Sequence, residues 1–349
     1  MSAALNSICI LRLSALGDVC NAVAAVQAIQ VRHPQAKITW VIGQIEHQLV
    51  NNLPNVEFIS FDKKQGRMAR KEFKARFKHR KFDVLLHMQV AMRANRLAGF
   101  INATRKIGFD KKRAKELHSL FISERIKAQE QAHVLDGFLG FAEALNVDLN
   151  TNKPSWTIPV SESEQAFADQ HVPLNRKTLI ICPAASKRER CWLPERYACV
   201  ADAALKEGFS VILAGAPAPL DKELSDQIIA LAKGQITNLV GKSSLKEMYA
   251  LLGNASWVLA PDTGPAHMAN AQGTPVLGLY GHSNPARTGP YNFLRYVVEV
   301  YHEHLLLQQG KTAQQLPWGK RVKGDAIMQN ITTEAVICMM HKLIKQEAL

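Results

Sequence analysis

The sequence alternates short apolar runs, rich in β-branched residues, with longer amphipathic stretches, and it does so in two blocks. Strands are predicted at residues 8–13, 38–42, 56–61 and 84–87 of the first block and at 178–182, 210–214, 237–240, 257–260 and 276–280 of the second. Strands that alternate with helices pair in parallel, because the returning chain must cross the face of the sheet. The chain is therefore predicted to be α/β, with two doubly wound parallel sheets.

A proline-punctuated stretch separates the two blocks, as expected for a 349-residue chain with about two domains. Ile158-Pro159 and Val172-Pro173 disfavour helix at these points, and only a short helix around 163–169 is expected between them. We predict domains at residues 1–155 and 177–330, joined by a linker region at 156–176. Residues 331–349 form a final amphipathic helix, a candidate for packing back on the first domain.

Composition excludes several classes of protein. Apolar residues make up 47% of the chain and charged residues 21%, which is typical of a globular protein rather than a disordered one. The six cysteines form no C-x-x-C pair, which argues against a disulfide framework or a cysteine zinc site. No apolar run approaches the roughly 20 residues of a membrane span, and the N-terminus lacks the order of a signal peptide. A cytoplasmic protein is predicted.

The net charge of +13 is concentrated in the first half of the chain. Residues 1–150 hold 23 Lys and Arg against 13 Asp and Glu, and residues 63–81 alone hold ten basic residues and one acidic one. An anionic partner is expected, such as nucleic acid, a phosphorylated glycan or an acidic membrane surface. Interleaved Phe73, Phe77 and Phe82 allow base stacking as one hypothesis, but the four-residue spacing of the first two favours a buried helix face.

The first candidate site is S-A-L-G-D at residues 14–18, directly after the first predicted strand. In open α/β sheets, ligands bind beyond the carboxyl ends of the strands. Asp18 is either a helix N-cap or a carboxylate that accepts a proton from a hydroxyl group. Gly17 allows a ligand to approach closely. The segment is neither a dinucleotide fingerprint nor a P-loop.

The second candidate site is P-D-T-G-P-A-H at residues 261–267, between a predicted strand and a helix. Free backbone N–H groups and the positive end of a helix dipole favour a phosphate there. Gly264 removes a blocking side chain, and His267 on the first turn is expected to face the same ligand. The simpler interpretation is a proline-shaped turn that is capped by Asp262.

A third segment carries cations at the end of a predicted strand. Lys187, Arg188 and Arg190 lie within residues 186–192, where guanidinium groups suit a diphosphate, although a solvated charge run is the alternative. No metal site is predicted, because the twelve histidines show no metal-ligand spacing and no D-x-D occurs. A G-x-S-x-G hydrolase motif is absent as well.

Taken in order, these motifs resemble those of the ADP-heptose:lipopolysaccharide heptosyltransferases, glycosyltransferase family 9. The resemblance lies in R-L-S-A-L-G-D-V at 12–19, C-W-L-P-E-R-Y at 191–197, L-V-G-K-S-S-L at 239–245, D-T-G-P-A-H-M-A at 262–269 and G-T-P-V-L-G-L-Y-G at 273–281. It implies a GT-B architecture, in which two Rossmann-like domains face across a cleft. The N-terminal domain would bind the sugar acceptor and the C-terminal domain the nucleotide-sugar donor.

The resemblance also implies roles for individual residues. Asp18 matches the general base. The donor-binding positions are Arg190, Asp221, Ser243, Asp262, Thr263, Gly264 and His267. Thr263, Gly264 and His267 would hold the diphosphate, and Asp262 the donor sugar. Asp221 would lie near the ribose and Ser243 near the adenine. Arg190 falls where close relatives carry lysine, which keeps a positive charge there. The acceptor-binding positions are Ser14, Gly17, Arg93 and Arg96, with the two arginines meeting Kdo carboxylates.

The implied function is an inverting, metal-independent transfer of heptose from ADP-heptose to the Kdo of the lipopolysaccharide inner core. Transfer of the first heptose is favoured over the second, and no cofactor is expected. The partners would be ADP-heptose, Kdo-lipid A and the anionic inner membrane, and no nucleic acid. Residues 63–81 would contact lipid phosphates, which places the protein at the cytoplasmic face of that membrane. The alternatives are a family relative that transfers another nucleotide-activated sugar, or a basic nucleic-acid-binding protein.

Overall fold

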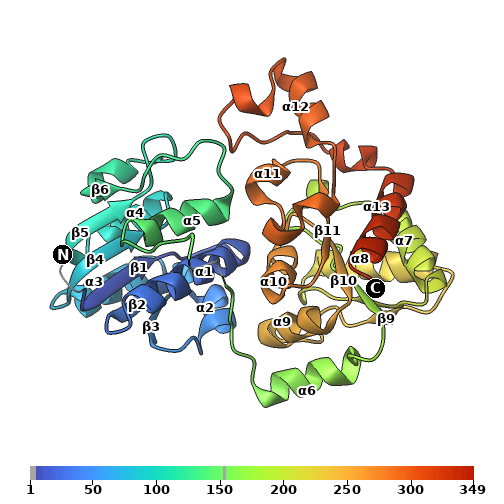
Figure 1. Cartoon of the computed structure of the whole chain (residues 1–349), viewed down its shortest axis with the longest axis horizontal. Helices are drawn as coiled ribbons and strands as arrows, with labels where there is room; N and C mark the ends of the chain where they lie inside the picture. The colour runs from blue at the N-terminus through green and yellow to red at the C-terminus, as the bar shows by residue number, and fades with distance from the viewer. Residues whose placement is uncertain (1–4, 152–154) are drawn as a thin grey trace. The chain divides into compact units, whose positions relative to one another are not determined.

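The computed structural model describes residues 5–151 and 155–349, and the chain divides into two units, Met1–Pro159 and Val160–Leu349. Figure 1 shows the elements of both units. Residues 1–4 and 152–154, near the two ends of the first predicted domain, lie outside the described residues. Each unit contains one six-stranded sheet, and its strands pair in parallel. The predicted α/β class with two parallel sheets is confirmed.

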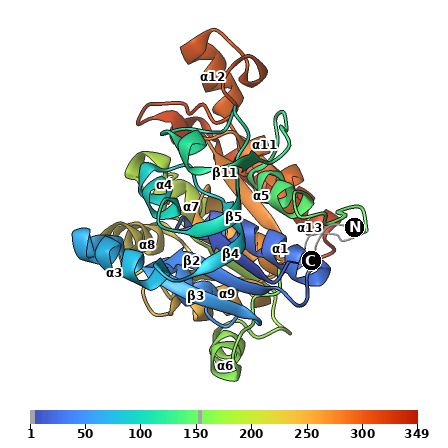
Figure 2. The same cartoon turned by 90° about the vertical axis from the view of Figure 1, so that its left-hand side faces the viewer.

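Unit 1 has the strand order β3-β2-β1-β4-β5-β6. Its strands are β1 (Ser7–Leu11), β2 (Lys37–Gly43), β3 (Val56–Phe61), β4 (Lys81–His87), β5 (Asn102–Gly108) and β6 (Glu124–Arg125). Its helices are α1 (Leu16–Arg32), α2 (Gln44–Val50), α3 (Arg67–Phe77), α4 (Met92–Ala98) and α5 (Val134–Glu143), with 3-10 turns η1 (Lys63–Gln65) and η2 (His118–Phe121). Figure 2 shows α1 and α5 on one face of the sheet and α3 and α4 on the other.

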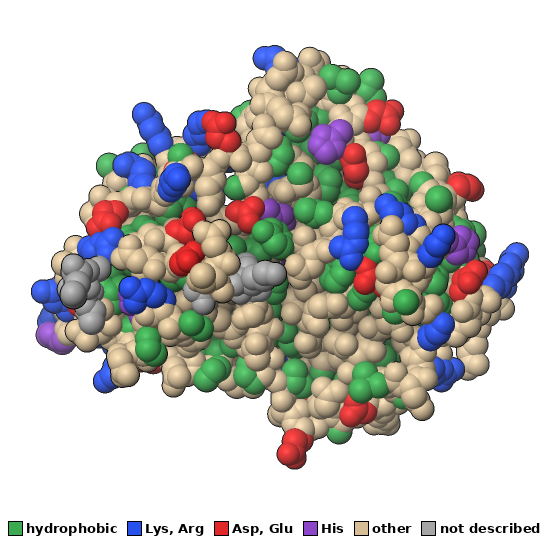
Figure 3. Space-filling view, viewed as in Figure 1, with side chains coloured by type: hydrophobic (Ala, Val, Ile, Leu, Met, Phe, Trp, Pro, Cys, Tyr) green, Lys and Arg blue, Asp and Glu red, His purple; other side chains and the backbone are tan. Residues whose placement is uncertain are grey.

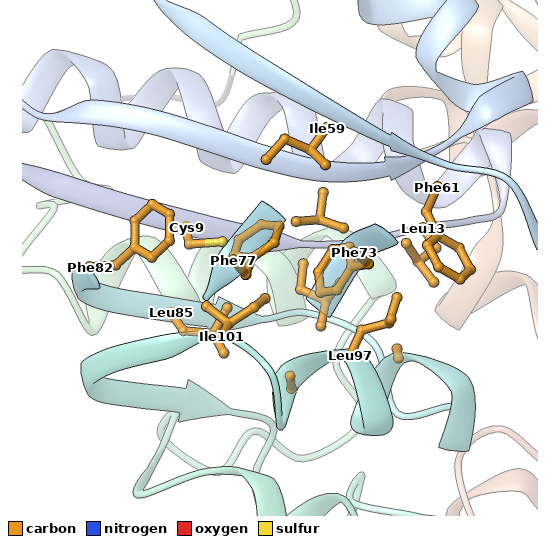
Figure 4. Close-up of a cluster of buried hydrophobic side chains, with 14 of the residues drawn as sticks. Cys9, Leu13, Ile59, Phe61, Phe73, Phe77, Phe82, Leu85, Leu97 and Ile101 are labelled. Carbon is orange, nitrogen blue, oxygen red and sulfur yellow. The ribbon is translucent and has the colours of Figure 1, made fainter. Parts of the chain in front are cut away.

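The basic segment at 63–81 forms η1 and α3, and the aromatic residues of this helix are buried. Phe73 and Phe77 are 4% and 1% exposed, and their stacked rings lie 4.3 Å apart. With Phe82 they belong to a hydrophobic cluster between the sheet, α3 and α4 (Figure 4). The helix-face interpretation is confirmed, so these rings are not available for stacking on nucleic-acid bases.

Unit 2 has the strand order β12-β11-β10-β7-β8-β9. Its strands are β7 (Thr178–Ile181), β8 (Ser210–Leu213), β9 (Thr237–Asn238), β10 (Trp257–Pro261), β11 (Val276–Tyr280) and β12 (Val297–Glu299). Its longer helices are α6 (Glu162–His171), α7 (Pro194–Lys206), α8 (Pro219–Leu231), α9 (Leu245–Asn254), α10 (Gly264–Gln272), α12 (Tyr301–Gln309) and α13 (Thr333–Gln346). Its shorter elements are α11 (Pro285–Thr288), η3 (Arg188–Arg190), η4 (Tyr291–Tyr296), η5 (Ala313–Gln315) and η6 (Ile327–Asn330).

The ends of several helices in unit 2 follow from local sequence. Ser244 caps α9, accepting a hydrogen bond from the Glu247 N–H at 3.2 Å, while the Glu247 side chain bonds back to the Ser244 N–H. Gly273, in the left-handed conformation at φ 78°, ends α10. The sequence predicts both features, because a capping box and a helix-ending glycine are local signals.

The helix within the expected linker and the C-terminal helix both belong to unit 2. α6 covers residues 162–171 of the expected linker, begins after the Ser161 cap and packs against α9. The C-terminal helix α13, a candidate for packing on the first domain, contacts α7 and β12 and is part of unit 2. No helix of the described segments combines the length and apolar character needed to cross a bilayer.

Both sheets have the same winding. In each unit the first strand, β1 or β7, lies between the second strand and the fourth. Connections on the two sides of this central pair run to opposite faces, which opens a crevice at the carboxyl ends of the pair. A ligand is therefore expected beyond β1 and β4 in unit 1 and beyond β7 and β10 in unit 2.

Candidate functional site

Hydrogen bonds join the loops that follow β1 and β4, the two central strands of the unit 1 sheet. The Arg12 Nη1 donates to the carbonyl oxygen of Met88 at 2.7 Å, and the Leu13 N–H donates to Gln89 Oε1 at 2.7 Å. Arg12 and Leu13 follow β1, whereas Met88 and Gln89 follow β4. The predicted strand 8–13 thus ends early, at Leu11, and its last two residues form part of the site.

Asp18 is the third residue of α1, and its carboxylate is bound through one oxygen. Oδ2 accepts hydrogen bonds from the Arg12 guanidinium and, at 3.4 Å, from the Ala15 N–H. The N-cap itself is Ala15, so the interpretation of Asp18 as N-cap is wrong. The side chain is 33% exposed, and within residues 5–151 and 155–349 no hydrogen bond to Oδ1 is recorded. One oxygen is held in place while the other remains able to accept a proton.

Arg12 was not among the predicted site residues, although it begins the R-L-S-A-L-G-D-V motif. Its side chain is 11% exposed, and its guanidinium lies over the Phe138 ring of α5 at 5.1 Å. A guanidinium held by an aromatic ring, a carbonyl oxygen and a carboxylate is a rigid cation. Its position could have been noticed from the sequence, because a lone arginine near the end of an otherwise apolar run suggests a specific partner for its charge.

The predicted acceptor residues occupy two neighbouring parts of unit 1. The Ser14 hydroxyl accepts a hydrogen bond from Gln89 Nε2 at 3.4 Å, and Gly17 is buried in the first turn of α1. Arg93 and Arg96 are exposed on α4, which follows β4. Because β1 and β4 are adjacent, all four residues lie on segments that leave the same edge of the sheet.

A buried polar cluster anchors α4 beneath these arginines. The Asn95 Oδ1 lies 2.8 Å from His87 Nε2 and 3.1 Å from His118 Nδ1, and the Asn95 Nδ2 donates to the Glu116 carbonyl oxygen at 2.6 Å. His118 Nε2 accepts from the Phe109 N–H at 3.2 Å. Because Nε2 of His118 accepts while Nδ1 donates to Asn95, the His118 ring is neutral, and the Nδ1 of His87 is buried with no hydrogen-bond partner within the described part of the chain.

The pKa values of both histidines are low. Burial, followed by the charges of His118, Lys106 and Arg12, lowers the pKa of His87 to about 3, although its Asn95 hydrogen bond acts in the opposite direction. Burial and the charge of Arg125 lower the pKa of His118 to about 4.

Stability is therefore expected to depend on pH in the acidic range. The unfolded chain binds protons near the ordinary histidine pKa of 6.5, whereas the folded chain binds them only near pH 4 and below. The stabilisation is complete above pH 6.5 and decreases as the pH falls toward 4, by about 1.4 kcal/mol for each unit of lowered pKa. Urea unfolding at pH 7.5 and pH 5 measures this loss. The His118→Gln variant should lose less stability over that interval, and an unchanged difference would contradict the explanation.

An arginine–aspartate pair also lies at the carboxyl ends of the two central strands of unit 2, β7 and β10. Arg190, in η3 after β7, donates from Nη2 to Asp262 Oδ2 at 2.9 Å and to the Asp262 carbonyl oxygen at 3.0 Å. The two side chains are 14% and 15% exposed. Because Asp262 follows β10, this ion pair joins the loops after the two central strands, as the Arg12 contacts do in unit 1.

Asp262 is surrounded by groups that favour its charged form. The Ser283 hydroxyl, after β11, donates to Oδ2 at 2.5 Å, and His267 Nε2 lies 3.8 Å from Oδ1, an ion-pair distance when the ring is protonated. Burial raises the pKa of Asp262, but His267, Ser283 and Arg190 more than offset it, so the pKa lies below its ordinary value. Ser283 was not among the predicted site residues.

The turn at 262–264 presents the start of α10 at this edge. Thr263 is the N-cap residue, but its hydroxyl donates to the Pro261 carbonyl oxygen at 3.2 Å, and no side-chain cap bond is made within this described helix. The first N–H groups of a helix have no intrahelical partners, so the start of α10 can bind an anion. Gly264 and the mostly buried His267 belong to this first turn.

Asp221 and Ser243 lie beyond the next two strands of the sheet. Asp221 Oδ1 accepts from the Ala216 N–H at 3.0 Å, which closes the loop after β8, and burial raises the pKa of its carboxyl group. The Ser243 hydroxyl, after β9, is buried and has no hydrogen-bond partner among the described residues. A buried hydroxyl without a partner suits a position beside a ligand.

The predicted donor residues thus share one edge of one sheet. Arg190, Asp262, Thr263, Gly264 and His267 form a contiguous group at the two central strands. Across residues 5–151 and 155–349, no group of three or more His, Cys, Asp or Glu side chains is arranged to hold a metal ion.

Comparisons with known proteins agree on one family. A family model described as glycosyltransferase family 9 (heptosyltransferase) matches residues 70–334. The lipopolysaccharide core heptosyltransferase OpsX of Haemophilus influenzae is 44% identical over 338 residues, 97% of each chain.

Solved structures share the fold over nearly the whole chain. The glycosyl transferase family 9 protein from Veillonella parvula has a TM-score of 0.79 at 23% identity and covers 99% of each chain. The E. coli heptosyltransferase WaaC with ADP-2-deoxy-2-fluoro heptose has a TM-score of 0.73 at 19% identity, covering 96% of this chain and 99% of the other. The GT-B fold class implied by the motifs is confirmed.

Proposed function

The chain belongs to glycosyltransferase family 9, and from this premise we propose that it transfers heptose from ADP-heptose to the Kdo of the lipopolysaccharide inner core. The observation that carries the proposal is the 44% identity to a lipopolysaccharide core heptosyltransferase over 97% of both chains. The proposed reaction inverts the anomeric centre, needs no metal ion and adds the first heptose rather than the second.

The edge of the unit 2 sheet supports a donor site for ADP-heptose. Arg190 and the uncapped start of α10 supply positive charge where a diphosphate would lie. Asp262, fixed by Arg190 and Ser283, can accept hydrogen bonds from hydroxyl groups of the sugar. The unpartnered hydroxyl of Ser243 would lie near the adenine, and Asp221 near the ribose.

Asp18 would act as the general base in this reaction. Its free Oδ1 takes the proton from the acceptor hydroxyl as that oxygen attacks the anomeric carbon of heptose. The bond from this carbon to the diphosphate oxygen breaks, and ADP leaves with the electron pair. A single displacement inverts the configuration, and Arg12 holds the carboxylate in place throughout.

The leaving group needs stabilisation because negative charge grows on the departing ADP. Fixed donors aimed at developing charge stabilise a transition state more than a ground state. The N–H groups at Thr263 and Gly264, the dipole of α10 and the Arg190 guanidinium provide such donors in unit 2. This is the support for a metal-independent reaction.

The acceptor would lie along unit 1, between Ser14 and Gly17 at β1 and the arginines of α4. Kdo carries a carboxylate, and exposed Arg93 and Arg96 can bind it with two N–H groups each. The basic segment 63–81 would contact lipid phosphates or the anionic membrane surface at its cytoplasmic face. We therefore propose a peripheral association with that membrane.

One assay tests the reaction and the order of addition together. Purified protein is incubated with ADP-heptose and Kdo-lipid A, and ADP release is followed with and without a chelator. We expect equal ADP release in both cases, and little release when the acceptor already carries the first heptose. Turnover that stops with the chelator would contradict metal independence. Absence of turnover with ADP-heptose, but turnover with another nucleotide sugar, would favour the alternative donor.

A further inference from the structure

Two leucines at the turn η2 of unit 1 are exposed, although a histidine of the same turn is buried. Leu117 and Leu120 are 62% and 75% exposed, whereas His118 is 1% exposed and Phe121 packs against the core cluster. Leu117 precedes the helix as its N-cap residue, and the Leu120 N–H donates to the Leu117 carbonyl oxygen at 2.9 Å, so the two residues close one turn of the chain. The two leucines therefore lie close together at the surface, while His118 and Phe121 of the same turn face the interior.

The two leucines are exposed on a well-held turn and not on a frayed segment. His118 is bonded on both ring nitrogens, to Asn95 and to the Phe109 N–H, and Glu116 accepts a hydrogen bond from Asn95 just before the turn. Because the inner side is held at several points, the two leucines cannot rotate into the core. Their exposure needs an explanation outside the isolated chain.

The leucines lie within a strongly basic layer of unit 1. η2 contacts α4, and α4 contacts α3, so the three elements form one layer of the unit. Figure 3 shows the opposite face of unit 1, where Lys and Arg side chains also project from the surface. Exposed cations that form no ion pair within the described part of the chain lie on these elements and on the segments directly before α3 and η2: Lys64, Arg67, Lys71, Lys74, Arg93, Arg96, Lys111 and Lys115. Met68 on α3 is 65% exposed among them.

We propose that the layer formed by α3, α4 and η2 is a docking surface for an anionic lipid bilayer. Leu117 and Leu120 enter the boundary between headgroups and acyl chains, while the surrounding Lys and Arg side chains contact lipid phosphates. A bilayer offers both chemistries side by side, whereas nucleic acid would match the cations and leave the leucines exposed. The inference deepens the peripheral membrane contact of the proposed function and rests on it.

Vesicle sedimentation tests the leucines directly. The wild-type chain and a Leu117→Asn/Leu120→Asn variant are mixed with vesicles of phosphatidylethanolamine and phosphatidylglycerol that contain no acceptor. Asparagine is chosen because Leu117 has φ 63°, a left-handed conformation that asparagine tolerates. We expect the variant to bind about tenfold more weakly, because two leucines no longer leave water. Lys111→Glu/Lys115→Glu should also bind more weakly, and the difference should shrink at high salt.

The matched control places the same change on exposed leucines elsewhere. Leu306 and Leu307 of α12, in unit 2, are 51% and 72% exposed, and Leu306→Asn/Leu307→Asn should bind vesicles like the wild type. Equal vesicle binding by wild type and Leu117→Asn/Leu120→Asn would overturn the proposal. Binding of single-stranded RNA, with no binding to vesicles, would also overturn it. Turnover of a water-soluble Kdo acceptor distinguishes failure of the docking proposal from failure of the proposed transfer reaction. The leucine variant should retain this turnover even if membrane docking is lost.

Discussion

Replacing Asp18 with asparagine is expected to lower the rate of heptosyl transfer by about 10²- to 10⁴-fold, the usual contribution of a general base. The amide keeps the size of the carboxylate and one oxygen for Arg12, but it removes the proton acceptor at the free Oδ1. The proposed donor residues lie in the other unit, so affinity for ADP should stay near that of the wild type. Single-turnover kinetics and calorimetric titration with ADP measure the two quantities separately.

Asp136 offers a matched control for the helix-terminus role of Asp18. It is also the third residue of a helix, α5, and its Oδ2 accepts from the His133 N–H at 3.1 Å. Asp136→Asn should therefore alter the local helix start in the same way without removing the base. Equal losses of turnover in the two variants would identify Asp18 as a structural residue. Transfer at the wild-type rate by Asp18→Asn would remove the assignment altogether.

The alternation of apolar runs was enough to predict two parallel sheets, because strands buried on both faces are apolar along most of their length. β5 was not predicted, because Arg105 and Lys106 interrupt its apolar pattern. In the structure the Arg105 guanidinium pairs with Glu124 of β6 at 2.7 Å, a partner that a local pattern cannot show. β6 itself has two residues, too few for any periodicity.

The candidate site was predictable where its residues are close in sequence. Residues 262–267 form one turn, and the strand–turn–helix pattern places that turn at the edge of a sheet. Ser283 comes 21 residues after Asp262, and only the pairing of β10 with β11 brings their following loops together. Arg12 was assigned to a strand, because a single sequence does not show where pairing ends.

Among the proposed donor residues, Arg190 should contribute most to binding ADP-heptose and to stabilising the departing ADP. Arg190→Met removes the guanidinium that is bonded to Asp262 and, in the proposed reaction, faces the departing diphosphate. Loss of one such fixed donor typically costs about 10²- to 10³-fold in rate, and kcat/KM for ADP-heptose is expected to fall by this amount. Affinity for ADP should fall as well, because the product carries the same diphosphate. Arg190→Lys keeps the positive charge but replaces the planar guanidinium with an ammonium group, and it should show a smaller loss.

The control for Arg190 lies two residues earlier in the same turn. Arg188 is 61% exposed and pairs with Glu223 on the surface, so Arg188→Met removes an equal charge from η3 without touching Asp262. If only the general positive charge of this segment attracts the donor, both variants should lose kcat/KM alike, and both losses should diminish as salt is added. If Arg190 acts through its fixed position, its loss persists at high salt while Arg188→Met remains close to the wild type. Near-wild-type kinetics for Arg190→Met at low and high salt would exclude Arg190 from the donor site.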